Sequence, residues 1–300
     1  MKKITKAVIP AAGYGTRFLP FTKIMPKEML PIVDTPTIEL IVREAISSGI
    51  TDVLIIINRD KDIIKTHFGH NLSLEKFLEN KNKKEELEII KELPKLVNVS
   101  FIYQDEMKGL GHAVNLAKDF VNNEPFLLLL GDDLYVSEKD PASLQLIKAY
   151  EKTSSSILGT LVVPDNDVSK YGICSPIDKN SKERLLELDS VVEKPDLKDA
   201  PSNLAIGGRY ILTPTIFEYL QTQKPGKGGE IQLTDSILRL KEKEKIYSYE
   251  LDAKRYDIGS KKGFLEATID FALNRDDLKD DIKRIINERK IWEWKTLIFL

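Results

Sequence analysis

The first half of the chain alternates short, unbroken apolar runs with longer amphipathic stretches. Strands of this kind, separated by helices, are typical of a mainly parallel sheet that helices cover on both faces. Residues 75–95 are rich in Lys, Glu and Asn and predict a solvated helical excursion. The predicted strands are residues 6–11, 52–57, 99–104 and 126–132, and the predicted helices are residues 36–48, 61–68, 110–120 and 141–151.

The second half is richer in strands, with few helices between them. We expect these strands to extend the same sheet and to build a smaller β-rich lobe. The predicted fold class is therefore α/β: a Rossmann-like mixed, mainly parallel sheet with helices on both faces and a smaller lobe. Helical periodicity returns over residues 261–290. The predicted strands of this half are residues 155–163, 171–177, 185–194, 203–212 and 246–252.

Length and charge exclude several classes of protein. The 300 residues hold 45 Lys and Arg against 47 Asp and Glu, so no net field draws the chain to nucleic acid or to a membrane surface. No apolar run approaches the roughly 18 residues of a membrane span, and the amino terminus lacks the apolar core of a signal peptide. The only cysteine, Cys174, excludes an internal disulfide and fits a reducing compartment. We expect a cytoplasmic protein.

The first apolar run ends at Pro10 and leads into Ala-Ala-Gly-Tyr-Gly-Thr-Arg. Glycine is common wherever a strand turns toward a helix, so Gly13 and Gly15 alone would be ordinary turn residues. Their missing Cβ atoms also let backbone N–H groups approach a phosphate or a base. A dinucleotide fingerprint would need glycine at Phe18, and there is no Walker loop. Three cations follow, an arrangement that suits a triphosphate: Arg17, Lys23 and Lys27.

Several other polar residues stand where two interpretations are open. Asp132 follows an apolar run at the carboxyl end of a predicted strand, where parallel sheets bind ligands, but aspartate also begins turns there. Asp257 alone is typical of a turn, and Glu193 and Lys194 alone are typical of a solvated strand exit. Gln104 carries an amide that both donates and accepts, as recognition of a base edge requires.

Eight motifs occur in chain order over about residues 5–270: AAGYGTRFLPFTKIMPKEMLPIVDTP, YQDEMKGLGHAV, LLLLGDD, YGICSPI, VVEKP, IGGRYIL, GGEIQLTDSI and YDIGSKKGF. Together they resemble the sugar-1-phosphate nucleotidyltransferases, and a chance match of eight ordered motifs is negligible. Within that family, the runs PKEMLP (26–31) and EIQLTD (230–235) are most similar to the uridylyl branch.

The resemblance implies that about residues 1–135 form the nucleotide-binding half. In this family, Arg17 and Lys27 correspond to residues that meet the nucleotide phosphates. Gln104, five residues before Gly109, stands at the family position that reads the uracil edge, and Glu28 supports the base end of the site. The implied nucleotide-binding residues are Ala11, Ala12, Gly13, Glu28, Gln104 and Gly109.

The resemblance also implies a metal site. Asp132 and Asp257 match the residues that bind one Mg²⁺ bridging the nucleotide phosphates. The chemistry agrees, because Mg²⁺ prefers hard oxygen ligands and usually takes only one or two protein carboxylates beside phosphates and water. Asp133 has no matching role in the family pattern, so it is left out of the predicted site.

About residues 136–260 are implied to form the sugar-binding half. There Glu193 corresponds to the residue that binds sugar hydroxyls, and Lys194 to the residue that binds the sugar phosphate. Gly172 and Gly208 match family glycines that let the backbone approach the sugar. Residues 1–260 would then form one catalytic domain.

The implied activity is transfer of a uridylyl group from UTP to glucose 1-phosphate, giving UDP-glucose and pyrophosphate by in-line displacement at the α-phosphorus. Arg17, Lys27 and Lys194 would be catalytic by placing and neutralising charge. The attacking phosphate is already anionic, with a second pKa of about 6, so His112 is not needed as a base. Two alternatives are a thymidylyl- or adenylyltransferase and a silent nucleotide-sugar sensor, although a sensor need not keep both metal ligands and both phosphate cations.

The end of the chain predicts a helical tail over residues 261–300. One apolar stripe is expected on its helix, made of Leu278, Ile282, Ile285 and Ile286. An apolar segment over residues 291–300 follows. The stripe fits either packing on the chain's own core or assembly, and the resemblance favours assembly into a homodimer or homotetramer.

Overall fold

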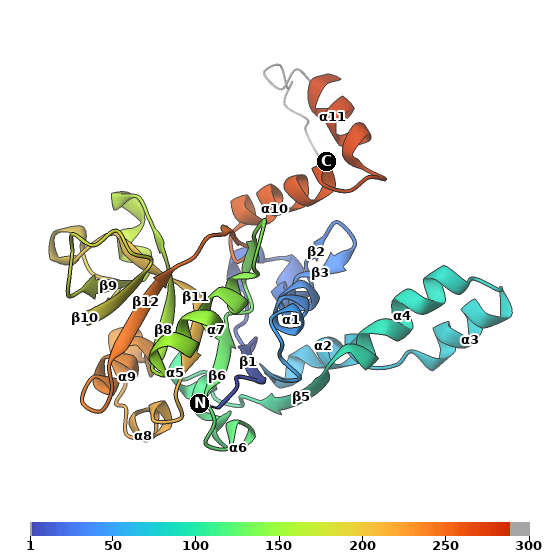
Figure 1. Cartoon of the computed structure of the whole chain (residues 1–300). Coiled ribbons are helices and arrows are strands. Elements are labelled where there is room, and N and C mark those ends of the chain that lie inside the picture. Colours follow the sequence, from blue (N-terminus) through green and yellow to red (C-terminus); the bar gives the residue numbers. More distant parts are fainter. Residues whose placement is uncertain (1, 289–300) are drawn as a thin grey trace.

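The computed structural model describes residues 2–288 and is built around one nine-stranded sheet (Figure 1). The sheet is mixed. Its first four neighbours, β5, β4, β1 and β6, are parallel, whereas β11 runs antiparallel to both β6 and β8. In spatial order the strands are β5 (Asn98–Tyr103), β4 (Asp52–Ile57), β1 (Lys6–Pro10), β6 (Phe126–Leu129), β11 (Leu204–Leu212), β8 (Ser156–Val162), β12 (Ile246–Glu250), β10 (Leu185–Glu193) and β9 (Gly172–Pro176).

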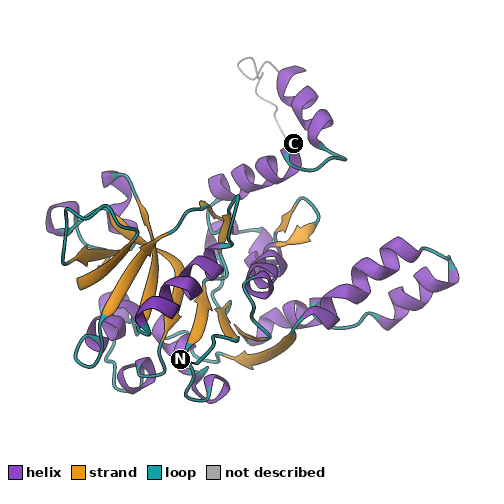
Figure 2. Cartoon of the chain, viewed as in Figure 1, coloured by secondary structure: helices purple, strands orange, loops and turns teal. Residues whose placement is uncertain are grey.

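Helices cover both faces of this sheet (Figure 2). The side chains of β1 alternate between the two faces: Ile9 belongs to the core beneath α1 and α7, and Val8 to the core beneath α5, α8 and α9. This period of two is the one that a strand buried on both sides requires. The helices are α1 (Thr37–Ser47), α2 (Asp62–His67), α5 (Leu110–Asn115), α6 (Lys118–Val121), α7 (Ala142–Thr153), α8 (Ile216–Leu220) and α9 (Leu233–Leu240).

A helical arm leaves the body between β4 and β5. Its helices, α3 (Leu72–Asn80) and α4 (Lys84–Leu96), pack on one another and project away from the sheet (Figure 1). Most of its side chains are exposed, as the Lys- and Glu-rich sequence predicted. The solvated helical excursion is confirmed.

Two short ribbons accompany the main sheet, and neither was predicted. Strand β2 (Pro31–Ile32) pairs with β3 (Thr35–Pro36), and β7 (Asp133–Val136) pairs antiparallel with β13 (Lys254–Asp257). The second ribbon sets Asp257 opposite Asp133, which adjoins Asp132 in the chain. It therefore joins two aspartate segments that are more than a hundred residues apart in the sequence.

The described tail consists of α10 (Lys261–Leu273) and α11 (Lys279–Glu288). Helix α10 packs on β13 through Phe264, Ala267 and Phe271. No residue of α11 is buried, and Ile285 and Ile286 are exposed. The described part of the chain thus leaves Ile285 and Ile286 of the predicted stripe exposed, whereas Leu278 and Ile282 are half-buried. The apolar segment 291–300 lies outside the described residues.

Candidate active site

The loop after β1 forms one wall of a cavity of about 470 Å³. This wall lies at the carboxyl ends of β1, β4, β5 and β6, where parallel sheets bind their ligands. Gly15 has a left-handed φ of 65°, and a Cβ there would stand 3.1 Å from Cβ of Lys27, so glycine fits this turn. Gly13 has no heavy atom within 4 Å of its Cβ position, which leaves its backbone open.

Five of the predicted residues line this cavity: Ala12, Gly13, Gln104, Gly109 and Asp132. Ala11 lies buried behind the loop, and its N–H donates to the carbonyl of Ile56 at 2.7 Å. The wall also contains Tyr14, Met107 and Glu230, which the sequence did not single out. Gly109 has a φ of 98°, and a Cβ there would lie 2.7 Å from Cβ of Glu230, so only glycine allows this close approach.

The amide of Gln104 has a defined orientation. Its Nε2 donates to the carbonyl of Gly109 at 3.3 Å and lies 3.0 Å from Nδ1 of His112. Both contacts occupy the donor side of the amide, and Oε1 accepts no hydrogen bond from the described residues. Gln104 therefore offers the cavity an acceptor, and His112 orients an amide.

Cations and carboxylates meet at the next part of the wall. Nζ of Lys27 lies 2.5 Å from Oδ2 of Asp132, and the guanidinium of Arg17 lies 3.9 Å from Asp132 and 4.0 Å from Asp257. Burial alone would raise the pKa of Asp132, but Lys27 and Arg17 hold it below its ordinary value. Burial alone would lower the pKa of Lys27, but Asp132 and Glu28 raise it. These shifts favour the charged forms of Asp132 and Lys27.

Asp132 and Asp257 converge as the metal prediction requires. An oxygen of Asp132 and an oxygen of Asp257 both lie within 3.1 Å of the point where a Cβ on Gly259 would stand. A guanidinium nitrogen of Arg17 lies 2.8 Å from the same point, so a cationic group already stands beside both carboxylates. Two carboxylates this close fit one Mg²⁺ that takes its remaining ligands from phosphates and water. Within residues 2–288, no group of three or more His, Cys, Asp or Glu side chains could hold a metal on its own.

Glu28 is wholly buried beside this cluster. Its Oε2 accepts from Nζ of Lys61 at 2.7 Å, and its Oε1 has no partner among the described residues. Burial raises the pKa of Glu28 and lowers that of Lys61, each partner opposing the shift of the other. Glu28 directly follows Lys27 in the chain. Its partner Lys61 is a buried cation that was not predicted.

The predicted sugar residues form a second group. Oε2 of Glu193 accepts from Oγ1 of Thr234 at 2.7 Å and lies 3.3 Å from the Cβ position of Gly172. Lys194 has a left-handed φ of 45°, and its N–H donates to the carbonyl of Tyr171 at 2.9 Å. Its side chain is 46% exposed, so its ammonium is accessible to a ligand.

A buried ion pair joins the two groups. The Asp133 carboxylate lies 2.6 Å from Nε of Arg255, whose Nη1 lies 3.0 Å from the Tyr171 hydroxyl. Gly208 adopts a φ of 74°, and a Cβ on it would overlap the Asp133 carboxylate, which is a packing reason for that glycine. Burial raises the pKa of Asp133 to about 6, against the opposing charge of Arg255. Through Arg255 and Tyr171, Asp133 therefore connects the cavity wall at Asp132 to the group around Gly172 and Glu193.

Asn58, Lys61, Thr234 and Arg255 were not predicted. A signal was available for Asn58, which directly follows β4 of the parallel sheet, as Gln104 directly follows β5. Thr234 lies inside the EIQLTD run, which was used only to compare family branches. Arg255 stands two residues before Asp257, and no sequence pattern marks its partner.

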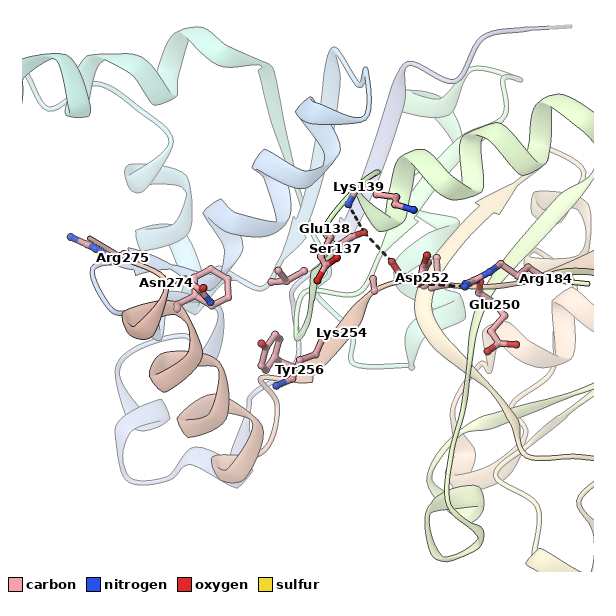
Figure 3. Close-up of a pocket in the computed structure, with 14 residues that line it drawn as sticks. Ser137, Glu138, Lys139, Arg184, Glu250, Asp252, Lys254, Tyr256, Asn274 and Arg275 are labelled. Carbon is pink, nitrogen blue, oxygen red and sulfur yellow. Dashed lines mark hydrogen bonds and ion pairs between the residues drawn. The ribbon is translucent and has the colours of Figure 1, made fainter. Parts of the chain in front are cut away.

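A larger cavity of about 900 Å³ lies at the far end of the β7–β13 ribbon (Figure 3). None of the predicted site residues lines it. Two of its cations are engaged within the chain: Arg184 lies 3.4 Å from Asp252, and Lys254 lies 2.6 Å from Asp270. The glycine-containing loop after β1, which lines the first cavity, does not line this one.

The fold and this site define a nucleotidyltransferase, and comparisons with known proteins agree. The chain matches the nucleotidyl transferase family over residues 6–273 and belongs to it. The UTP–glucose-1-phosphate uridylyltransferase of Staphylococcus epidermidis is 49% identical over 291 residues, which are 97% of this chain and 100% of the relative. The enzyme of the same name from Bacillus subtilis is 50% identical, covering 94% of this chain and 96% of its own length.

Solved structures show the same fold. A UDP-glucose pyrophosphorylase from Acinetobacter baumannii superposes with a TM-score of 0.88 at 36% identity, covering 96% of this chain and all of the neighbour. A UDP-glucose pyrophosphorylase in complex with UDP-glucose gives 0.82 at 42% identity, covering 91% of this chain and all of the neighbour. The predicted family and fold class are confirmed. In the described part of the chain, no helix has both the length and the apolar character needed to cross a bilayer.

Proposed function

We propose that this protein catalyses the reversible reaction of UTP with glucose 1-phosphate to give UDP-glucose and pyrophosphate. The observation that carries the proposal is one cavity lined by the open loop after β1, by Gln104 and by Asp132, which pairs with Lys27. Relatives named UTP–glucose-1-phosphate uridylyltransferase, about 50% identical over almost the whole chain, support it.

The reaction needs no covalent bond to the protein. A phosphate oxygen of glucose 1-phosphate bonds to the α-phosphorus of UTP. The bond from that phosphorus to the oxygen bridging the α- and β-phosphates breaks, and pyrophosphate leaves with the electron pair. Arg17 and Lys27 are placed to neutralise charge on the phosphates, and catalysis is then positioning plus electrostatics.

Choice of base is assigned to Gln104. Because its donor side is occupied by Gly109 and His112, it presents an acceptor to the cavity. Uracil offers one ring N–H between two carbonyls, and this N–H matches an acceptor. Ala11, Ala12, Gly13 and Gly109 supply the backbone around the nucleotide, and Glu28 holds the site from behind.

We propose that Asp132 and Asp257 hold one Mg²⁺, because their carboxylates converge beside the phosphate cations. When bound, the ion supplies charge neutralisation at the phosphates. On the sugar side, Glu193 accepts from sugar hydroxyls and Lys194 pairs with the sugar phosphate. Gly172 gives the backbone access, whereas Gly208 also makes room for Asp133.

We also propose a homodimer or homotetramer, because Ile285 and Ile286 of α11 are left exposed by the described chain. A cytoplasmic location is proposed from the single cysteine, which is free and buried.

Pyrophosphate release, measured with glucose 1-phosphate and UTP, dTTP, ATP or CTP in turn, tests the function. We expect UTP to be used most efficiently and only with a divalent metal. Faster release from dTTP or ATP would instead identify one of the alternative transferases, and no release from any of them would identify a silent sensor.

A further inference from the structure

Three successive carbonyls of the loop after β1 are held from behind by two side chains that have no assigned role. Nζ of Lys61 donates to the carbonyls of Ala11 and Gly13, each at 2.6 Å. Nδ2 of Asn58 donates to the carbonyl of Ala12, between them, at 2.7 Å. Both side chains are buried, and they follow β4, which lies beside β1 in the sheet.

These contacts determine where the loop's N–H groups point. Because a trans peptide is planar, the carbonyl of one residue and the N–H of the next point in opposite directions. The N–H groups of Ala12 and Tyr14 therefore point away from Lys61, and that of Gly13 points away from Asn58. All three residues line the cavity. None of these N–H groups has an acceptor among the described residues. Successive N–H groups that face a concave space form an anion-binding nest.

Lys61 also connects this nest to the phosphate cations. Its third contact is Oε2 of Glu28 at 2.7 Å, and Glu28 directly follows Lys27, which pairs with Asp132. The ammonium thus touches both the loop and the segment that carries Lys27. A buried lysine needs such a counter-charge, which explains why Glu28 is wholly buried here.

We propose that Asn58 and Lys61 are positioning residues for the nucleotide's triphosphate: by holding three loop carbonyls, they turn the N–H groups of residues 12–14 onto the phosphate chain. This inference rests on the proposed function for the identity of the nucleotide. It assigns Asn58 and Lys61 to the phosphates and not to the base, because Gln104 stands at the base end.

The test compares binding of UTP with binding of uridine, which lacks phosphates, by calorimetry without sugar phosphate. Asn58→Asp removes the donor but keeps the Oδ1 that accepts from the N–H of Asp60. Lys61→Gln removes the charge. Each variant should bind UTP about tenfold more weakly or worse, since hydrogen bonds to charged groups are lost, and should bind uridine as the wild type does.

Matched controls lie on neighbouring segments. Lys65→Gln makes the same change at an exposed lysine of α2, and Asn71→Asp makes it at the exposed residue that caps α3. Both controls should bind UTP normally. Equal weakening of UTP and uridine in Asn58→Asp or Lys61→Gln would show a general role in folding of the loop, and unchanged UTP binding would remove the role altogether; either result overturns the proposal.

A measurement on the unaltered protein does not depend on the variants being stable. On titration with pyrophosphate alone, the backbone amide resonances of Ala12, Gly13 and Tyr14 should shift, and those of Lys65 should not. Absence of shifts at residues 12–14 overturns the proposal. If the wild type prefers another triphosphate, the proposed function fails while the same comparison, made with that triphosphate and its nucleoside, still tests the nest.

Discussion

Single residues of the cavity act in oppositely charged pairs. Lys27 lies 2.5 Å from Asp132, and Arg17 lies 3.9 Å from Asp132 and 4.0 Å from Asp257. Lys27 and Arg17 lower the pKa of Asp132 and so favour its ionised form before any ligand arrives. A phosphate chain with the proposed metal would replace these contacts with similar ones. The charged side chains are thus already in place, which reduces the reorganisation of the site needed during the reaction.

Asp132→Asn and Asp257→Asn should each lower turnover at ordinary Mg²⁺ by at least about 100-fold, because each removes one charge from the metal site. Removal of metal with a chelator should abolish turnover in the wild type. Steady-state rates across a Mg²⁺ series measure both effects. Asp178→Asn, at an exposed turn, is the matched control and should behave as the wild type. Wild-type rates in either site variant would exclude that carboxylate as a ligand.

Lys194→Ala should raise the KM for glucose 1-phosphate about tenfold or more while the KM for UTP changes little, because its proposed partner is the phosphate of the second substrate. Varying each substrate in turn gives both constants. Lys198→Ala, at an exposed lysine nearby, controls for the change of charge. The assignment would be misplaced if UTP affinity were lost while the KM for glucose 1-phosphate stayed normal.

Among the elements, the β7–β13 ribbon connects the two halves of the site. It carries Asp133 and Arg255, whose ion pair is almost fully buried at 6% and 13% side-chain exposure. Through the Tyr171 hydroxyl, Arg255 reaches the strand that contains Gly172. The ribbon therefore connects the segments of Asp132 and Asp257 to the segment of Gly172.

Arg255→Met should lower the free energy of unfolding by about 3–5 kcal/mol, because it leaves the buried Asp133 charge uncompensated. Urea denaturation measures this loss. Arg43→Met, at a more exposed arginine paired with Glu39 and Glu92, should cost only about 1 kcal/mol or less. Equal losses of unfolding free energy in the two variants would mean that the buried ion pair of the ribbon stabilises the fold no more than an exposed pair does.

The elements also show what a sequence can predict. Strands such as β4 and β6 are continuous apolar runs, and Gln104 and Asp132 follow strand ends at which ligand-binding residues are expected. In contrast, β7 and β13 have only four residues each, with charges at Asp133, Lys254 and Asp257, so no periodicity marks them. The contacts of Lys61 could not be predicted from the sequence either, because two of its partners are backbone carbonyls, which every residue has.

At the scale of the whole molecule, the described tail leaves several apolar side chains exposed. They are Ile285 and Ile286 on α11 and Leu265 and Ile269 on α10. Surfaces of this kind usually mark a contact with another chain.

Deletion of residues 276–300 should lower the molar mass measured by light scattering while leaving uridylyl transfer measurable, because the tail contributes no predicted site residue. An unchanged mass would show that the stripe does not mediate assembly. Loss of activity in a folded, truncated protein would place the tail in the site.

The proposed function depends on attack by a phosphate oxygen of glucose 1-phosphate on the α-phosphorus of UTP. Glucose 1-phosphate labelled with ¹⁸O in its phosphate, with mass spectrometry of the products formed with UTP, tests this step. We expect UDP-glucose that keeps all of the label and pyrophosphate that carries none. Labelled pyrophosphate, or consumption of UTP without labelled UDP-glucose, would contradict it.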